Sequence, residues 1–183
     1  KDTGEKDNRL VLRTHTSPVQ IRAMEQYGAP LKIIVPGRVY RNEATDASHE
    51  ATFWQVEGLV IDKNISVADL KGTMELVIET MLGTKARWRP GYFPFVEPGL
   101  EMEIGCLLCK GQGCRVCKKT GWLEFMGAGL VHPNVIEAGG LDPKEYSGFA
   151  FGFGLERLHM LKYGVDDIRL YKSGDLRFLE QFS

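Results

Sequence analysis

An amide and a carboxylate interrupt the apolar segment 53–58, where they could bind a charged group. Successive side chains of a strand point to opposite faces, so Phe53, Gln55 and Glu57 are expected on one face. A carboxylate among apolar residues is unfavourable unless a partner compensates its charge. The pattern indicates a site for an ammonium group at Gln55 and Glu57. The alternative is the solvent-exposed face of an edge strand.

Two arginines could supply an anion site beside it. Residues 39–43 alternate as a short strand, which would place Arg41 and Glu43 on one face. Arg157 falls in the first turn of a helix predicted after the glycine-rich run 148–154. A helix N-terminus favours anions, and a cation there is destabilising unless it has an anionic partner. Arg157 therefore indicates either a bound anion or a surface ion pair with a neighbouring carboxylate.

Two aromatic rings could form a wall of the same site. Phe93 and Phe95 share a face in the segment 92–97, which we expect to be a strand. Pro94 lies between them and cannot donate a ladder hydrogen bond, so this strand belongs at an edge or rim of the sheet. An ammonium site, an anion site and an aromatic wall together predict an aromatic amino acid bound beside a phosphate.

All four cysteines lie in one short segment with the pattern Cys-x2-Cys-x4-Cys-x2-Cys. Their clustering indicates a local metal site in a reducing compartment rather than a disulfide framework. Glycines in the central spacer allow a tight turn, so that one tetrahedral Zn²⁺ could bind all four. The alternative is a cysteine-rich turn without metal, reduced or oxidised. The predicted ligands are Cys106, Cys109, Cys114 and Cys117.

This cysteine segment should form a hairpin tip, residues 105–121, because it lies between the predicted strands 101–104 and 122–126. Basic side chains around the cysteines could neutralise bound thiolates or contact RNA. They are Lys110, Arg115, Lys118 and Lys119.

The composition excludes several classes of protein. The chain has 183 residues, 43% hydrophobic and 26% charged, which is enough for one globular domain with a sizeable core. Its formal net charge of −1 gives no global field that would attract nucleic acid or anionic lipid. No apolar run approaches the ~20 residues of a membrane helix, and residues 1–9 lack a signal-peptide pattern. We expect a cytoplasmic protein without a membrane partner.

The positions of capping residues, glycines and prolines predict few helices and many strands. Capping residues and glycines delimit helices at 18–27, 67–82 and 155–163. At the first of these, Ser17 and Gln20 are the predicted capping pair. Runs of short strands bounded by turns, with helices bracketing them, favour an α+β domain built on an antiparallel sheet. The predicted strands are 31–35, 39–43, 53–62, 92–97, 101–104, 122–126 and 148–153.

Six segments in order resemble the catalytic domain of the bacterial phenylalanyl-tRNA synthetase alpha subunit, a class II aminoacyl-tRNA synthetase, over residues 10–182. The second and the last are similar to class II motifs 2 and 3. The resemblance implies an antiparallel sheet flanked by helices, with the cysteine hairpin as a small insertion. The segments are RTHTSP (13–18), PGRVYRNE (36–43), FWQVEG (53–58), YFPFVEP (92–98), GLVHP (129–133) and GFAFGFGLER (148–157).

For ATP, the resemblance implies that Arg41 holds the α-phosphate, Glu43 binds the adenine amino group and Phe53 stacks on the adenine. It assigns the outer phosphates to His49 and Arg157, which together with Arg41 are the implied catalytic residues. The full implied ATP set is Arg41, Glu43, His49, Phe53, Gly154 and Arg157.

For the amino acid, the resemblance implies that Gln55 and Glu57 bind the α-ammonium group of phenylalanine. Phe93 and Phe95 would meet its ring edge-on, and Ala150 would shape the back of the side-chain pocket. The remaining implied contacts are His15, Ser17, Gln20 and Gly152.

The implied activity is ATP-dependent formation of phenylalanyl-adenylate and transfer of the phenylalanyl group to tRNA(Phe). The implied assembly is an (αβ)₂ heterotetramer with the beta subunit, and Glu97 resembles a position that binds Mg²⁺ near that partner. Two other interpretations remain, a synthetase-like paralogue that does not charge tRNA and a non-catalytic zinc-ribbon interaction module. In the family, motif 1 and a coiled coil precede the region matching Arg13, so we expect residues 1–183 to be one catalytic domain, a fragment with weak or no activity alone.

Overall fold

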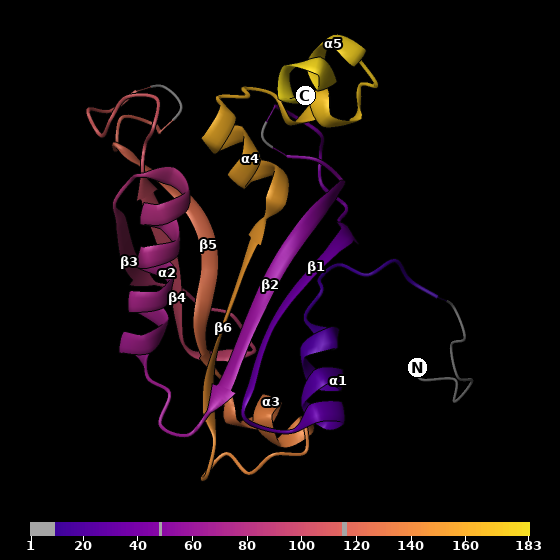
Figure 1. The fold of residues 1–183 in the computed structure, drawn as a ribbon, viewed down its shortest axis with the longest axis vertical. Coiled ribbons are helices and arrows are strands. Elements are labelled where there is room, and N and C mark those ends of the chain that lie inside the picture. Colours follow the sequence, from indigo (N-terminus) through magenta and orange to yellow (C-terminus); the bar gives the residue numbers. More distant parts are fainter. Residues whose placement is uncertain (1–9, 48, 115–116) are drawn as a thin grey trace, which may run out of the picture.

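A six-stranded antiparallel sheet forms the centre of the fold in a computed structural model that describes residues 10–47, 49–114 and 117–183 (Figure 1). The strand order is β1-β2-β6-β5-β4-β3. The predicted α+β class, an antiparallel sheet with flanking helices, is confirmed. The strands are β1 (Leu31–Tyr40), β2 (Thr52–Asp62), β3 (Ala86–Pro90), β4 (Val96–Gly105), β5 (Trp122–Val131) and β6 (Ser147–Gly154).

Three longer helices begin and end at signals that are visible in the sequence. Helix α1 (Pro18–Tyr27) starts with a proline, whose missing N–H is tolerated in a first turn. Helix α2 (Val67–Leu82) has a capping box between Ser66 and Asp69. It ends at Gly83, and α4 (Leu155–Tyr163) ends at Gly164, each glycine in the left-handed conformation. These three helices confirm the sequence predictions.

Four short helical segments cannot be predicted from hydrophobic periodicity, because each has six residues or fewer. Asp167 and Asp175 cap two of them by accepting backbone N–H bonds. No helix in the described part of the chain is long and apolar enough to cross a bilayer. The four segments are α3 (Pro133–Ala138), η1 (Ile168–Lys172), α5 (Leu176–Leu179) and η2 (Glu180–Phe182).

The helices pack on both faces of the sheet (Figure 1). Helices α2 and α4 cover one face, where Phe149 belongs to the larger buried cluster. Helices α1 and α3 cover part of the other face, over Leu59. The register explains this division, because Val60 pairs with Phe149 on the first face and Leu59 pairs with Ala150 on the second. Gln55 and Glu57 alternate in step with Leu59 and therefore lie on the second face.

Strand β1 corrects two predictions about the first half of the chain. It runs without a break through Pro36, which is tolerated because β1 is an edge strand paired with β2 alone. It ends at Tyr40, so the predicted strand 39–43 is wrong beyond that residue. Strand β2 lies between β1 and β6, which contradicts the edge-strand interpretation of Gln55 and Glu57.

The segment before β4 also differs from its prediction. Residues 91–95 form no strand, and a turn there is closed by the Val96 N–H, which donates to the Phe93 carbonyl at 3.2 Å. The predicted strand 92–97 is therefore wrong except for its last two residues. Strand β3 is absent from the prediction because its five residues include two arginines and a terminal proline.

Candidate active site

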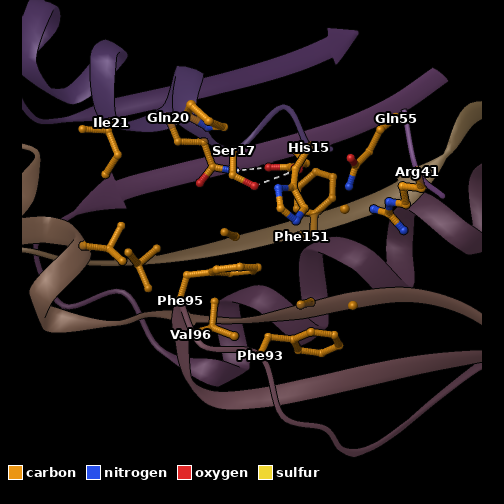
Figure 2. Close-up of a pocket in the computed structure, with 18 residues that line it drawn as sticks. His15, Ser17, Gln20, Ile21, Arg41, Gln55, Phe93, Phe95, Val96 and Phe151 are labelled. Atoms are coloured by element: carbon orange, nitrogen blue, oxygen red, sulfur yellow. Dashed lines mark hydrogen bonds between the residues drawn. The ribbon is translucent and has the colours of Figure 1, made fainter. Parts of the chain in front are cut away.

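Glu57 is a buried carboxylate, 5% exposed, at the centre of the site. Ser17 Oγ donates to its Oε1 at 3.0 Å, and Gln20 Nε2 donates to its Oε2 at 2.7 Å (Figure 2). The sequence predicts these two residues as a capping pair of α1, but neither side chain caps the helix. Their side chains hold the carboxylate instead. Among the described residues no cation pairs with Glu57, so its charge is available to a ligand cation.

Gln55 lies one strand repeat away from Glu57. Its Oε1 is buried and accepts no hydrogen bond from the described residues. A buried acceptor without a donor is unfavourable, and most such groups in proteins are satisfied. A ligand that carries N–H donors would satisfy it. The amide and the carboxylate together therefore suit an ammonium group.

A cavity of about 730 Å³ opens beside these two side chains (Figure 2). Arg41 lies at one end and Ile21 at the other, while Phe93 and Phe95 face Ser17 across it. Its volume is within the roughly 300–1,000 Å³ usual for small-molecule sites. Its further lining residues are His15, Pro18, Gln20, Gln55, Glu57, Val96, Gly127, Ala128, Val131, Val135, Ala150, Phe151 and Gly152.

The floor of this cavity is made of small residues on β5 and β6. Gly127 pairs with Gly152 across the two strands. A Cβ on Gly127 would lie 2.7 Å from Phe93 Cζ, and one on Gly152 would lie 3.1 Å from Glu57 Cγ. Ala150, the next residue of β6 on this face, also lines the cavity. The Phe93 ring and the Glu57 side chain therefore occupy the space that side chains at Gly127 and Gly152 would fill.

The rim carries His15, which is exposed and meets Phe95 edge to face at 6.2 Å between ring centroids. Its Nδ1 lies 3.0 Å from Thr14 Oγ1. The structure thus brings all nine residues that the sequence suggests for phenylalanine to one cavity: His15, Ser17, Gln20, Gln55, Glu57, Phe93, Phe95, Ala150 and Gly152.

A second cavity, of about 190 Å³, is more polar. The Arg41 guanidinium lies over the Phe53 ring, 5.1 Å from its centroid, and Arg41 Nε donates to the Thr14 carbonyl at 3.3 Å. All six residues that the sequence suggests for ATP line this cavity: Arg41, Glu43, His49, Phe53, Gly154 and Arg157.

Two basic residues of this second cavity, His49 and Arg157, have distinct surroundings. His49 Nδ1 lies 3.1 Å from the Asp46 carboxylate. Arg157, in the first turn of α4, forms no ion pair within the described ranges. Its neighbour Glu156 accepts the Trp54 N–H at 2.9 Å instead, so a pair between Glu156 and Arg157 is not what the structure shows. An unpaired cation at a helix N-terminus suits a bound anion.

The two cavities meet. Both are lined by Arg41, Gln55, Gly127 and Gly152. A ligand in the first cavity with its ammonium group at Glu57 would therefore direct its other polar end toward Arg41. The arrangement can hold an amino acid and a phosphate side by side.

Sequence reasoning missed three acidic residues that line the second cavity, Glu50, Glu124 and Glu156. Glu124 lines the second cavity, and Arg89 Nη2 lies 3.6 Å from its carboxylate. Glu124 precedes a β-bulge, because Glu103 pairs with Glu124 and Met102 with Met126, which leaves one residue of β5 unpaired. A bulge leaves no reliable signal in a short strand pattern. Glu97, by contrast, is exposed on β4 and lines neither cavity.

The four cysteines lie together at the tip of the β4–β5 hairpin. Their Sγ atoms are all within 4.8 Å of one another, which makes them the one such metal-competent group among the described residues. Hydrogen bonds to its sulfur, the strongest of them from the Cys114 N–H, lower the pKa of Cys117 to about 6. Burial raises the pKa of Cys106 to about 11. Of the basic residues predicted around them, Arg115 lies outside the described residues.

Comparisons with known sequences identify the family of this chain. The family described as tRNA synthetases class II core domain (F) matches residues 1–182. The phenylalanine–tRNA ligase alpha subunit of Lactococcus lactis is 56% identical over all of this chain and 54% of its own length. That of Clostridium botulinum is 55% identical with the same coverage, and that of Staphylococcus epidermidis is 58% identical over 94% of this chain and 50% of its own. The chain spans about half the length of these curated relatives.

A solved structure shares the fold at low sequence identity. Pyrrolysyl-tRNA synthetase from Desulfitobacterium hafniense aligns with a TM-score of 0.63 and 17% identity, over 89% of this chain and 54% of that one. This likeness concerns the fold alone.

Proposed function

Because the chain belongs to the class II core-domain family of tRNA synthetases, we propose that it activates L-phenylalanine with ATP and transfers the phenylalanyl group to tRNA(Phe). The observation that carries the proposal is the junction of an apolar cavity and a charged cavity at Arg41 and Gln55. Relatives above 50% identity that are named phenylalanine–tRNA ligase alpha subunits support it.

In the proposed first step, a carboxylate oxygen of phenylalanine attacks the α-phosphorus of ATP. A new P–O bond forms, the bond from the α-phosphorus to the bridging oxygen breaks, and pyrophosphate leaves. The attacking carboxylate is already ionised at neutral pH, so no general base is required. The chain has to position the two substrates and stabilise charge on phosphorus. A guanidinium group suits both tasks, and Arg41 lines both cavities.

Phenylalanine would lie with its ammonium group at Glu57 and Gln55 and its ring against Phe93 and Phe95. The support is the buried Glu57 carboxylate, which has two neutral donors and no cation, and the unsatisfied Gln55 oxygen. Ordered neutral donors fix a carboxylate in place and leave its charge for a ligand.

ATP would occupy the second cavity, its adenine on Phe53 and its phosphates toward Arg41, His49 and Arg157. Mg²⁺, when bound with ATP, would neutralise charge on the phosphates. The Glu43 carboxylate would accept from the adenine amino group, and the Glu124 carboxylate fits the ion, which prefers oxygen ligands. We propose Glu97 as a separate Mg²⁺ position, exposed where a partner chain could add ligands.

The proposal includes partners and a setting. Since the curated relatives are named alpha subunits, we propose that this chain is one catalytic domain, with the cysteine tip 105–121 inserted, and works with a beta subunit in an (αβ)₂ assembly in the cytoplasm. Four free cysteines suit a reducing compartment.

ATP–pyrophosphate exchange on this chain, with each of the twenty amino acids, tests the proposal. We expect exchange that depends on phenylalanine, weak in the chain alone, and a loss of about 10²–10³-fold in Arg41→Gln, the range for removing one charge-stabilising donor. Arg38→Gln is the matched control, since Arg38 lies three residues earlier, on β1, and lines neither cavity. Failure to bind either phenylalanine or ATP would contradict the proposal and favour a non-catalytic module.

Charging of tRNA(Phe) in the presence of the beta subunit separates a synthetase from a paralogue that stops at the adenylate. We expect charging, because the relatives' names favour a ligase. Exchange without charging would support the paralogue.

A further inference from the structure

We propose that Cys106, Cys109, Cys114 and Cys117 bind one Zn²⁺ in a closed tetrahedral site at the tip of the β4–β5 hairpin. None of these cysteines lines either cavity, so the site is separate from the adenylation machinery. It is a structural metal site, in which the protein provides all four ligands.

Three of the six sulfur–sulfur distances match a tetrahedron around zinc, and the others are within 4.8 Å. The Sγ atoms of Cys106 and Cys114 are 3.8 Å apart, those of Cys109 and Cys117 are 3.8 Å apart, and those of Cys114 and Cys117 are 3.7 Å apart. A Zn–S bond of about 2.3 Å gives tetrahedral S···S edges of about 3.8 Å. A disulfide would require about 2.05 Å. The sulfurs are therefore spaced as ligands of one ion, and all four cysteines are free.

The two cysteine pairs adopt equivalent turns, eight residues apart. The Gly111 N–H donates to the Cys106 carbonyl, and the Lys119 N–H donates in the same way to the Cys114 carbonyl. Likewise the amides of Gln112 and Thr120 donate to the carbonyls of Cys109 and Cys117, both at 3.0 Å. Sulfur contacts join Cys106 to Cys114 and Cys109 to Cys117, the equivalent members of each pair. Two related turns that face each other form a four-ligand site.

The backbone of these turns requires something to hold it. Lys110 and Lys118, each directly after the second cysteine of its pair, have φ of 51° and 50°, and Lys119 has φ of 64°. Residues other than glycine rarely adopt this left-handed backbone conformation, which persists only where the surroundings enforce it. Four bonds to one ion would provide that constraint in a tip that has little apolar packing of its own.

Hydrogen bonds to sulfur complete the surroundings of the ligands. The Cys114 N–H donates to Cys117 Sγ at 3.0 Å, Gly113 to Cys109 Sγ at 3.2 Å and Gly121 to Cys117 Sγ at 3.3 Å. Cys106 and Cys117 are almost fully buried, at 1% and 3% exposed. Such bonds orient thiolate ligands and disperse their charge. Exposed lysines 110, 118 and 119 add positive charge next to a cluster that would carry two negative charges.

Metal analysis of the purified chain tests the site, with Zn²⁺ alone and Co²⁺ alone as probes. We expect one Zn²⁺ per chain, and a tetrahedral cobalt–thiolate absorption spectrum after substitution with Co²⁺. Cys109→Ser and Cys114→Ser should lose both signals. Gln112→Ala, which lies between the pairs and offers no thiolate, is the matched control and should keep them. One iron per chain, or four titratable thiols in the presence of excess Zn²⁺, would overturn the proposal.

Because the cysteine variants could fail to fold, chelation of the unmodified chain provides an independent test. Removal of Zn²⁺ should speed hydrogen exchange at the amides of Gly113, Cys114 and Gly121, which donate to sulfur, while peptides from α1 and β2 keep their rates. Readdition of Zn²⁺ should restore the slow rates. Unchanged exchange in the tip after metal removal would refute the structural role, whatever the outcome of the phenylalanine exchange assay.

Discussion

Replacing Glu57 with glutamine should weaken phenylalanine binding while the chain stays folded. The substitution preserves size and removes the negative charge that would meet the ammonium group. Its two partners can adapt, because the Ser17 hydroxyl can reverse its direction and the Gln20 amide can flip to offer an oxygen. Calorimetric titration of phenylalanine into each protein measures the dissociation constant, and thermal unfolding checks the fold.

The size of the effect follows from burial of the carboxylate. Glu57 is 5% exposed, so water cannot replace the lost charge. A hydrogen bond to a charged group contributes about 1.5–3 kcal/mol. Since 1.4 kcal/mol is tenfold, we expect the dissociation constant for phenylalanine to rise by about 10- to 150-fold.

A ligand without the ammonium group isolates this contact. 3-Phenylpropionate has the ring and carboxylate of phenylalanine but no ammonium group. We expect it to bind more weakly than phenylalanine, with the same affinity for Glu57→Gln as for the unmodified chain. Equal losses for both ligands would refute the assignment, because the substitution would then act through the shape of the cavity rather than through charge. An unchanged affinity for phenylalanine would refute it as well.

Three further predictions concern pocket size, pH dependence and helix capping. Ala150→Gly should admit para-substituted phenylalanines with larger rings, measured as amino-acid-dependent pyrophosphate exchange, and unchanged selectivity would contradict the pocket assignment. Burial lowers the pKa of His159 below its ordinary 6.5, so the unfolded chain binds a proton at this residue more readily than the folded chain does. Stability should therefore fall as the pH drops below 6.5. His159→Gln should flatten that part of a plot of Tm against pH. Ser66→Ala should cost about 1 kcal/mol of unfolding free energy in urea, because it removes the capping box of α2, whereas Ser183→Ala at the exposed chain end should cost almost nothing.

The parts of the site that follow from local pattern could be predicted from the sequence. Alternation in β2 places Gln55 and Glu57 on one face because the period of a strand is two. Proline, serine and glycine signals locate α1, α2 and α4 for similarly local reasons. These patterns depend on neighbours within a few residues.

The other features of the site depend on contacts between segments that are distant in the sequence. The turn 91–95 brings Phe93 over Gly127, more than thirty positions later in the chain, and alternation alone suggests a strand there. The bulge that follows Glu124 arises from its pairing with β4, so the part this carboxylate plays in the second cavity has no local signature. Ser17 and Gln20 carry a helix-cap signal, yet tertiary contact with Glu57 directs their side chains elsewhere.

The glycine floor makes the larger cavity adjustable in one direction only. At Gly127 and Gly152 the sheet backbone itself bounds the cavity, so every substitution there subtracts volume. Ala150 is the one position of the three where a methyl group can be removed. Any larger gain in volume has to come from the aromatic wall, where Phe93 and Phe95 are held by a turn rather than by paired strands. Variants with broader substrate range should therefore accumulate in residues 91–95, where changes leave the sheet register untouched.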